Sequence, residues 1–286
     1  MKLRGVYTAL VTPFQPNGEI DLQVFRTLCE RQLQAGVHGL VPCGTTGETP
    51  TLSSSEWQAL IKTAVDVSNG RYPVIAGCGT NNTATTVDNI QKAKAIGADA
   101  ALVVFPYYNK PNPSGLLLHI EAACEVGLPV VLYHVPGRTG QQLPATQLET
   151  LCRVSGVTAI KEATGDVALG IDLIQRLADT DVSVLSGDDF TFAALTAMGG
   201  DGVISVISNP APSLTTAWFH AADKTDRTLL MSLSSHLTPV VQYLFSDTNP
   251  APVKAMMSKM NLCADTVRLP LAVAKPPSKV LIRDLK

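Results

Sequence analysis

Short apolar runs alternate with segments of helical periodicity from the N-terminus of this 286-residue chain to about residue 206. Eight of the runs have the length of buried strands, and parallel strands covered on both faces are continuously apolar. They span residues 6–10, 39–41, 74–76, 100–104, 130–133, 157–160, 182–185 and 203–206. Residues 21–35 and 83–96 are examples of the intervening helical segments, with Asp21 as the expected N-cap of the first. Eight strand–helix units predict an α/β fold of the (β/α)₈ TIM barrel type.

The alternation stops after the eighth apolar run. Residues 225–244 and 252–260 have helical patterns with no strand between them, which indicates a C-terminal helical extension. We therefore expect a barrel carrying the active site over residues 1–224 and a helical region over 225–286. The alternative is a doubly wound open sheet, which needs a glycine-rich fingerprint early in the chain. Gly77-Cys78-Gly79 is the nearest candidate, and Asn82 occupies the place of the third glycine.

Composition limits the classes of function. Hydrophobic residues make up 45% of the chain and charged residues 16%, so a large core is expected. The formal net charge is -2 with no basic run, which argues against a nucleic-acid partner. No membrane span or signal-peptide pattern is recognisable, and we expect a cytoplasmic protein. The six cysteines include no CxxC pair, which favours reduced core thiols over disulfides or a metal site, and no cofactor is expected.

Lys161 follows the sixth apolar run, at the carboxyl end of a predicted strand. Parallel α/β folds place their chemistry at that end. Burial disfavours the charged form of a lysine, and a neutral amine can attack a ketone to form an imine. The alternative is a strand-end lysine that pairs with a carboxylate such as Glu162 or extends to solvent. Strand alternation directs Glu162 away from the barrel axis, so we expect it to be structural.

Other polar residues follow other predicted strands and should reach the same rim. They are Thr45 and Thr46 after the second strand, Tyr107 and Tyr108 after the fourth, Tyr133 and Arg138 at and after the fifth, and residues 186–189 after the seventh. Backbone N–H groups of a glycine-flanked turn suit a carboxylate or phosphate, and the guanidinium of an arginine binds a carboxylate in a fork. Each feature has a structural alternative. Together they indicate a keto-acid site and a carbon–carbon lyase or synthase that works through an imine.

Several motifs resemble those of the dihydrodipicolinate synthase / N-acetylneuraminate lyase family, in the family's order and over essentially the whole chain. The matching segments are Gly44-Thr45-Thr46-Gly47-Glu48, Pro106-Tyr107-Tyr108, Tyr133, residues 136–140, residues 160–165, residues 186–189, residues 202–205, residues 249–254 and residues 268–270. Of the family's branches, the synthase that condenses pyruvate with L-aspartate 4-semialdehyde on the path to diaminopimelate and lysine is the most similar.

The resemblance implies catalytic roles. Lys161 would form the imine with pyruvate. Thr45, Tyr133 and Tyr108 would form a proton-relay triad, a role to which hydroxyl groups are suited. Tyr107 would lie at or near the tight dimer interface, and we expect one tyrosine of the relay to come from a neighbouring subunit. The resemblance also suggests a homotetramer built as a dimer of dimers.

It implies binding roles as well. Thr46 and the amides of its loop would hold the carboxylate of pyruvate, and Gly187 and Ile204 would contribute backbone contacts. Arg138 would bind the second carboxylate, that of the semialdehyde. The sialic-acid lyases of the family lack this arginine, so Arg138 argues against a sugar-acid substrate. Another pyruvate-dependent aldolase or dehydratase of the family stays open as the alternative, and a non-catalytic barrel is the third possibility.

The chain departs from the family pattern at His134, where asparagine is usual, and at Gly137, where serine is frequent. It also departs where lysine-inhibited members bind their inhibitor. Ser54 and Trp57 replace histidines, and Thr85 replaces a glutamate. We therefore expect weak or absent inhibition by lysine.

Overall fold

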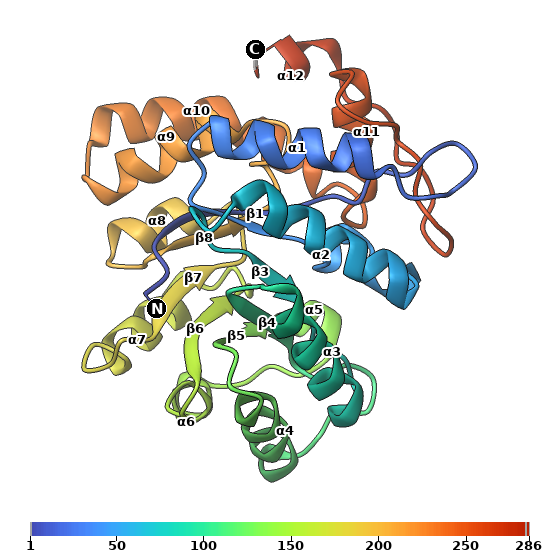
Figure 1. Ribbon diagram of the computed structural model, residues 1–286. Helices are drawn as coiled ribbons and strands as arrows, with labels where there is room; N and C mark the ends of the chain where they lie inside the picture. The colour runs from blue at the N-terminus through green and yellow to red at the C-terminus, as the bar shows by residue number, and fades with distance from the viewer. Residues whose placement is uncertain (1, 284, 286) are drawn as a thin grey trace.

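The computed structural model describes residues 2–283 and 285 and contains one eight-stranded parallel sheet in the order β2-β1-β8-β7-β6-β5-β4-β3 (Figure 1). An isolated parallel bridge between Leu40 and Val74 joins its two end strands, and the N–H of Gly77 donates to the carbonyl of Pro42 at 3.0 Å. The sheet is thus a closed barrel, as the sequence predicts. The strands are β1 (Gly5–Ala9), β2 (Gly39–Val41), β3 (Ile75–Gly77), β4 (Ala100–Val104), β5 (Val130–His134), β6 (Val157–Glu162), β7 (Ser183–Ser186) and β8 (Gly202–Ser205).

Helices cover the outside of the barrel (Figure 1). Most begin where the sequence offers a cap or a proline; the carboxylate of Asp21, for example, accepts from the N–H of Val24 at the start of α1. They are α1 (Leu22–Gln34), α2 (Ser54–Ser68), α3 (Thr83–Ile96), α4 (Pro113–Glu125), α5 (Pro136–Thr139), α6 (Ala145–Cys152), α7 (Val167–Arg176), α8 (Phe192–Ala197) and α9 (Pro212–Asp223). Both predicted example helices are confirmed.

Two apolar clusters follow from the alternation of side chains along the strands. On β5, Val131 and Tyr133 point into the barrel, whereas Val130 and Leu132 face the helices. The inner cluster is small, and the outer cluster between sheet and helices is the main core. The six cysteines are free, and all except Cys263 are buried, as predicted for core thiols.

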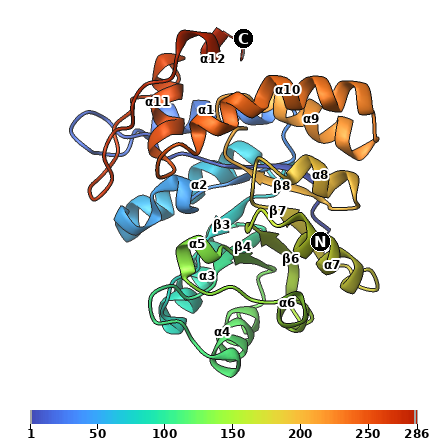
Figure 2. The same cartoon turned by 180° about the vertical axis from the view of Figure 1, so that it is seen from behind.

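Three further helices follow the barrel, namely α10 (Arg227–Leu244), α11 (Ala251–Lys259) and α12 (Lys279–Arg283). Figures 1 and 2 show them on the side of the molecule that carries α1 and α9. The helices predicted over 225–244 and 252–260 are confirmed, while a domain division at residue 224 stays a prediction. None of the described helices is both long and apolar enough to cross a membrane. The segment between α10 and α11 matters for function, because it reaches the rim of the barrel.

Candidate active site

Lys161 lies inside β6, one residue before its end, because the strand extends two residues beyond the predicted apolar run. Ala159, two residues earlier, belongs to the inner cluster, so alternation places the lysine side chain inside the barrel as well. In the register between β5 and β6, Lys161 pairs with Tyr133. The two side chains therefore stand next to each other at the carboxyl ends of the strands, as the sequence predicts.

The amine of Lys161 is enclosed but has no counter-ion. The residue is 6% exposed, and its Nζ lies 4.1 Å from the centroid of the Tyr133 ring. Gly187 lies against the lysine side chain, because a Cβ at that position would be 2.7 Å from Lys161 Cε. No carboxylate among residues 2–283 and 285 forms an ion pair with Lys161. The expected alternative of a Lys161–Glu162 pair is therefore wrong, and the amine is available for chemistry.

Two cavities lie near the amine of Lys161 and share some of their lining residues. The first has a volume of about 620 Å³ and is lined by Lys161, Tyr133, Thr45, Thr46, Arg138, Gly187 and Asn249, among others. The second has a volume of about 470 Å³ and lies towards α2. Thr45, Tyr133 and Arg138 line both. The structure thus brings six of the predicted site residues together around one space.

The loop after β2 presents the two threonines. Thr45–Gly47 forms a 3₁₀ turn, in which the N–H of Gly47 donates to the carbonyl of Gly44 at 3.0 Å. The hydroxyl of Thr12 donates to the carbonyl of Gly47 at 2.7 Å. Glu48 ends the turn with a φ of 56°, a left-handed conformation that a non-glycine residue adopts only when its surroundings hold it there.

A buried ion pair holds Glu48 in place. Its Oε1 accepts from Lys254 Nζ at 2.7 Å, and its Oε2 accepts from the backbone N–H of Arg268 at 2.9 Å. The ring of Phe14 lies 4.2 Å from the same Nζ. Burial lowers the pKa of Lys254, and the neighbouring Glu48 carboxylate opposes that shift. The C-terminal region therefore anchors the loop that carries Thr45 and Thr46.

Arg138 belongs to the short helix α5 and is exposed at the rim. Its Nη2 donates to the backbone carbonyl of Asn249 at 3.4 Å. Most of its guanidinium is consequently free to bind an anion, and its role as a carboxylate-binding residue stays a prediction.

The three remaining predicted residues, Tyr107, Tyr108 and Ile204, do not line the cavity that contains Lys161. Tyr107 lines the second cavity. Tyr108 is 89% exposed with a φ of 70° and lines neither cavity, so its own chain does not bring it to Lys161. Ile204 is buried in the inner cluster and is also absent from the described lining of both cavities, whereas Val206 lines the first. Roles for Tyr107, Tyr108 and Ile204 stay predictions.

His134 lies on the outer side of β5 and is fully buried. The N–H of Leu143 donates to its Nε2, so the ring carries its proton on Nδ1, 3.3 Å from Glu162 Oε1. Glu162 also accepts from the N–H of Thr164 at 2.9 Å. Glu162 is thus structural, as expected. The His134–Glu162 pair lies on the outer face of β5 and β6, whereas Tyr133 and Lys161 lie on the inner face.

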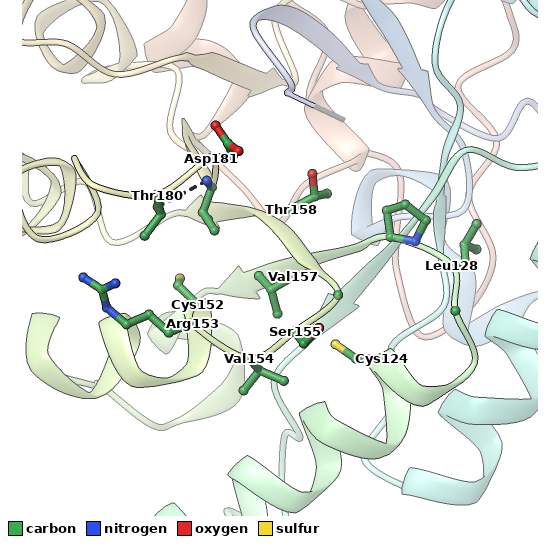
Figure 3. Close-up of a pocket in the computed structure, with 14 residues that line it drawn as sticks. Cys124, Leu128, Cys152, Arg153, Val154, Ser155, Val157, Thr158, Thr180 and Asp181 are labelled. Atoms are coloured by element: carbon green, nitrogen blue, oxygen red, sulfur yellow. Dashed lines mark hydrogen bonds between the residues drawn. The ribbon is translucent and has the colours of Figure 1, made fainter.

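A third cavity lies at the opposite end of the barrel, before the amino ends of β5, β6 and β7 (Figure 3). Its volume is about 610 Å³, and Cys124, Cys152 and Arg153 are among its lining residues. It contains none of the predicted site residues. Barrel enzymes work at the carboxyl ends of their strands, so this cavity is not the candidate active site.

Two residues of the site, Asn249 and Lys254, have no role that the sequence predicts. Both lie in the segment 249–254, whose only signal in the sequence is its resemblance to a family motif. Asn249 Nδ2 donates to Thr46 Oγ1 at 2.9 Å across 203 positions of the chain. No local periodicity signals a contact between residues so distant in the sequence.

Residues 2–281 match the model of the dihydrodipicolinate synthetase family. A protein of Exiguobacterium sibiricum named 4-hydroxy-tetrahydrodipicolinate synthase is 46% identical over 94% of this chain and 92% of its own length. The dihydrodipicolinate synthase of Thermotoga maritima superposes with a TM-score of 0.92 at 37% identity, covering 100% of this chain and 97% of that one. The chloride-inhibited dihydrodipicolinate synthase of Acinetobacter baumannii, solved with pyruvate, gives 0.92 at 38% identity, covering 99% and 96%.

Proposed function

The chain belongs to the dihydrodipicolinate synthetase family, and from this premise we propose how its site works. The protein is a lyase that condenses pyruvate with L-aspartate 4-semialdehyde to 4-hydroxy-tetrahydrodipicolinate, the reaction of lysine and diaminopimelate biosynthesis after which its relatives are named. One observation carries the assignment of its centre, namely the enclosed amine of Lys161, which has no counter-ion among the described residues and lies beside Tyr133.

Lys161 supplies the covalent step. Its Nζ attacks the ketone carbon of pyruvate, and loss of water leaves an imine. Loss of a methyl proton then gives an enamine, which forms the new carbon–carbon bond at the aldehyde of the second substrate. The α-amino group of that substrate closes the ring and displaces the lysine. Thr45 and Tyr133 line the space where these protons move, and their hydroxyls suit a relay.

Two groups match the two substrate carboxylates. Thr46 and the backbone amides of its turn are proposed to hold the carboxylate of pyruvate, since they line the cavity that contains Lys161. Arg138, at the rim, is proposed to hold the carboxylate of the semialdehyde. Gly187 keeps the lysine side chain accessible from its other side, because any larger residue would overlap it.

The relay is incomplete within one chain. Neither the Thr45 nor the Tyr133 hydroxyl has a hydrogen-bond partner among the described residues, and the exposed Tyr108 of the same chain lines neither cavity. We propose that Tyr108 of a neighbouring copy supplies the third hydroxyl, in a homotetramer built as a dimer of dimers. Mixing Y108F with K161R chains should then restore part of the activity that each variant lacks. A mixture as inactive as its components would contradict the shared site.

A cytoplasmic location is proposed because the relatives are biosynthetic enzymes that consume pyruvate. The alternative within the family is another pyruvate-dependent aldolase, and Arg138 favours the semialdehyde, which carries its own carboxylate, over a neutral partner.

A substrate comparison tests the proposal. The enzyme should turn over pyruvate with L-aspartate 4-semialdehyde in a coupled assay, with no cleavage of N-acetylneuraminate. Cleavage of N-acetylneuraminate without turnover of the semialdehyde would overturn the proposed substrate, although the imine chemistry of Lys161 would still hold.

A further inference from the structure

The segment between α10 and α11 forms one wall of the cavity that contains Lys161. Asn249 lies in that wall and contacts both groups proposed to bind carboxylates. Its side-chain Nδ2 donates to Thr46 Oγ1 at 2.9 Å, and its backbone carbonyl accepts from Arg138 Nη2 at 3.4 Å. This asparagine is therefore placed to act on the binding of substrate through its neighbours.

The direction of the Asn249–Thr46 hydrogen bond has a chemical consequence. An amide nitrogen only donates, so Thr46 Oγ1 is the acceptor and keeps its single proton for another partner. No other described group bonds to that hydroxyl. Its proton can therefore turn into the cavity, where a substrate carboxylate would accept it.

The opposite orientation of the amide would remove this donor. If Asn249 Oδ1 faced Thr46, it would capture the hydroxyl proton and bury an NH₂ group with no partner. In the observed orientation the unpartnered buried atom is Oδ1. Leaving an acceptor oxygen unpaired is better tolerated than leaving a donor unpaired, which favours the observed arrangement.

We propose that Asn249 is a positioning residue that commits the hydroxyl of Thr46 to donate to the carboxylate of pyruvate. This inference rests on the proposed function and deepens it, because it assigns a direction to the recognition of the keto acid. Replacing such a residue should change the pyruvate concentration at which half of the enzyme forms the imine. It should not change the ability of the Lys161 amine to form that imine at saturating pyruvate.

Two substitutions at position 249 separate this role from a structural one. An aspartate can only accept, so N249D should take the proton of Thr46 and raise the pyruvate concentration for half-maximal borohydride trapping by roughly 100-fold. N249A leaves the hydroxyl free to rotate and should raise it by about tenfold. Trapping at saturating pyruvate should persist in both. Equal effects of N249A and N249D, or none, would overturn the proposal.

T248D is the matched control for charge. It places a carboxylate one residue away, in the same exposed wall of the cavity, without touching Thr46. Its effect should be far smaller than that of N249D. If the two variants weaken pyruvate binding equally, the effect is general electrostatic repulsion and the hydrogen-bond argument fails.

A double-mutant cycle keeps the test decisive should N249D fail to fold. In a T46V background, which has no hydroxyl to orient, N249A should change the half-maximal concentration by less than about twofold. Additive effects would overturn the proposal. Failure of the wild-type enzyme to form any reducible adduct would instead refute the proposed function, so the two failures are distinguishable.

Discussion

Lys254 Nζ lies 2.7 Å from Glu48 Oε1, and both side chains are completely buried. The bond joins α11 to the loop that carries Thr45 and Thr46, across 206 positions of the chain. Among residues 2–283 and 285, two lysines are therefore buried, and their surroundings are opposite. Lys254 is paired with a carboxylate and has a structural role, whereas Lys161 has no such partner among the described residues and lines a cavity.

Replacing Lys254 should destabilise the fold. K254M leaves the Glu48 carboxylate buried without its counter-ion, which costs about 3–5 kcal/mol in comparable sites. Urea unfolding at fixed protein concentration measures the loss. E48Q/K254M should recover a large part of it, because no buried charge remains. The surface pair Lys62–Asp66, at 3.1 Å, supplies the control, and K62M should change the stability by less than about 1 kcal/mol. Similar losses in K254M and K62M would contradict this account.

Stability should depend on pH through Asp189. Burial raises the pKa of this carboxyl to about 6, against hydrogen bonds from the N–H groups of Ile207 and Val206 that lower it. A raised pKa means that the folded state binds the proton more tightly. The resulting stabilisation is present below the unfolded pKa of about 4 and is lost as the pH rises through 6.

The variant D189N should therefore gain stability relative to the wild type between pH 4.5 and 7.5, by up to about 3 kcal/mol. Urea unfolding across that range measures the difference. D181N, at an exposed aspartate, is the control and should show no such trend. A constant difference between D189N and the wild type would refute the assignment.

Arg138 should matter for the second substrate more than for the first. R138A removes the guanidinium at the rim, and kcat/KM for the semialdehyde should fall by roughly 10- to 100-fold, as expected for one charged hydrogen bond. Trapping of the pyruvate adduct should change only slightly. R138K keeps the charge but loses the forked geometry of the guanidinium, so its kcat/KM for the semialdehyde should lie between those of R138A and the wild type. Equal loss of both steps would show that the role of Arg138 is wrongly assigned.

L-lysine should inhibit weakly or not at all. Ser54 and Trp57 line the second cavity, and the Trp57 indole is tied to the carbonyl of Gly77 at 2.9 Å. Among the described residues that line it, only Arg138 is charged, so a lysine ammonium finds no carboxylate there. Titration of the turnover rate with L-lysine measures this, and T85E should increase any response. Half-inhibition of the wild type at sub-millimolar lysine would contradict the prediction.

Much of the barrel could be predicted because its strands are short apolar runs between glycines and prolines. All eight occur within about two residues of their predicted positions. The error at β6 is instructive, since the strand continues through Lys161 and Glu162, which are polar. A search for apolar runs misses the end of a strand when the last residues are polar because they have a catalytic role or form a buried polar contact such as Glu162–His134.

The site was predictable only in part. The rule that carboxyl ends of parallel strands converge correctly gathers Thr45, Tyr133 and Lys161. It cannot decide which of two adjacent tyrosines faces the cavity, and the exposure of Tyr108 depends on a left-handed backbone that the sequence does not signal. It also misses Asn249, because that contact arises only when the C-terminal region folds back onto the barrel.

The most direct test is reduction with borohydride in the presence of pyruvate, followed by peptide mass spectrometry. A reduced pyruvyl group should appear on Lys161 and on no other lysine, and K161R should yield none. Lys254 is the internal comparison, because it is also buried but is paired with Glu48. An unmodified Lys161, or an adduct on a different lysine, would contradict the account.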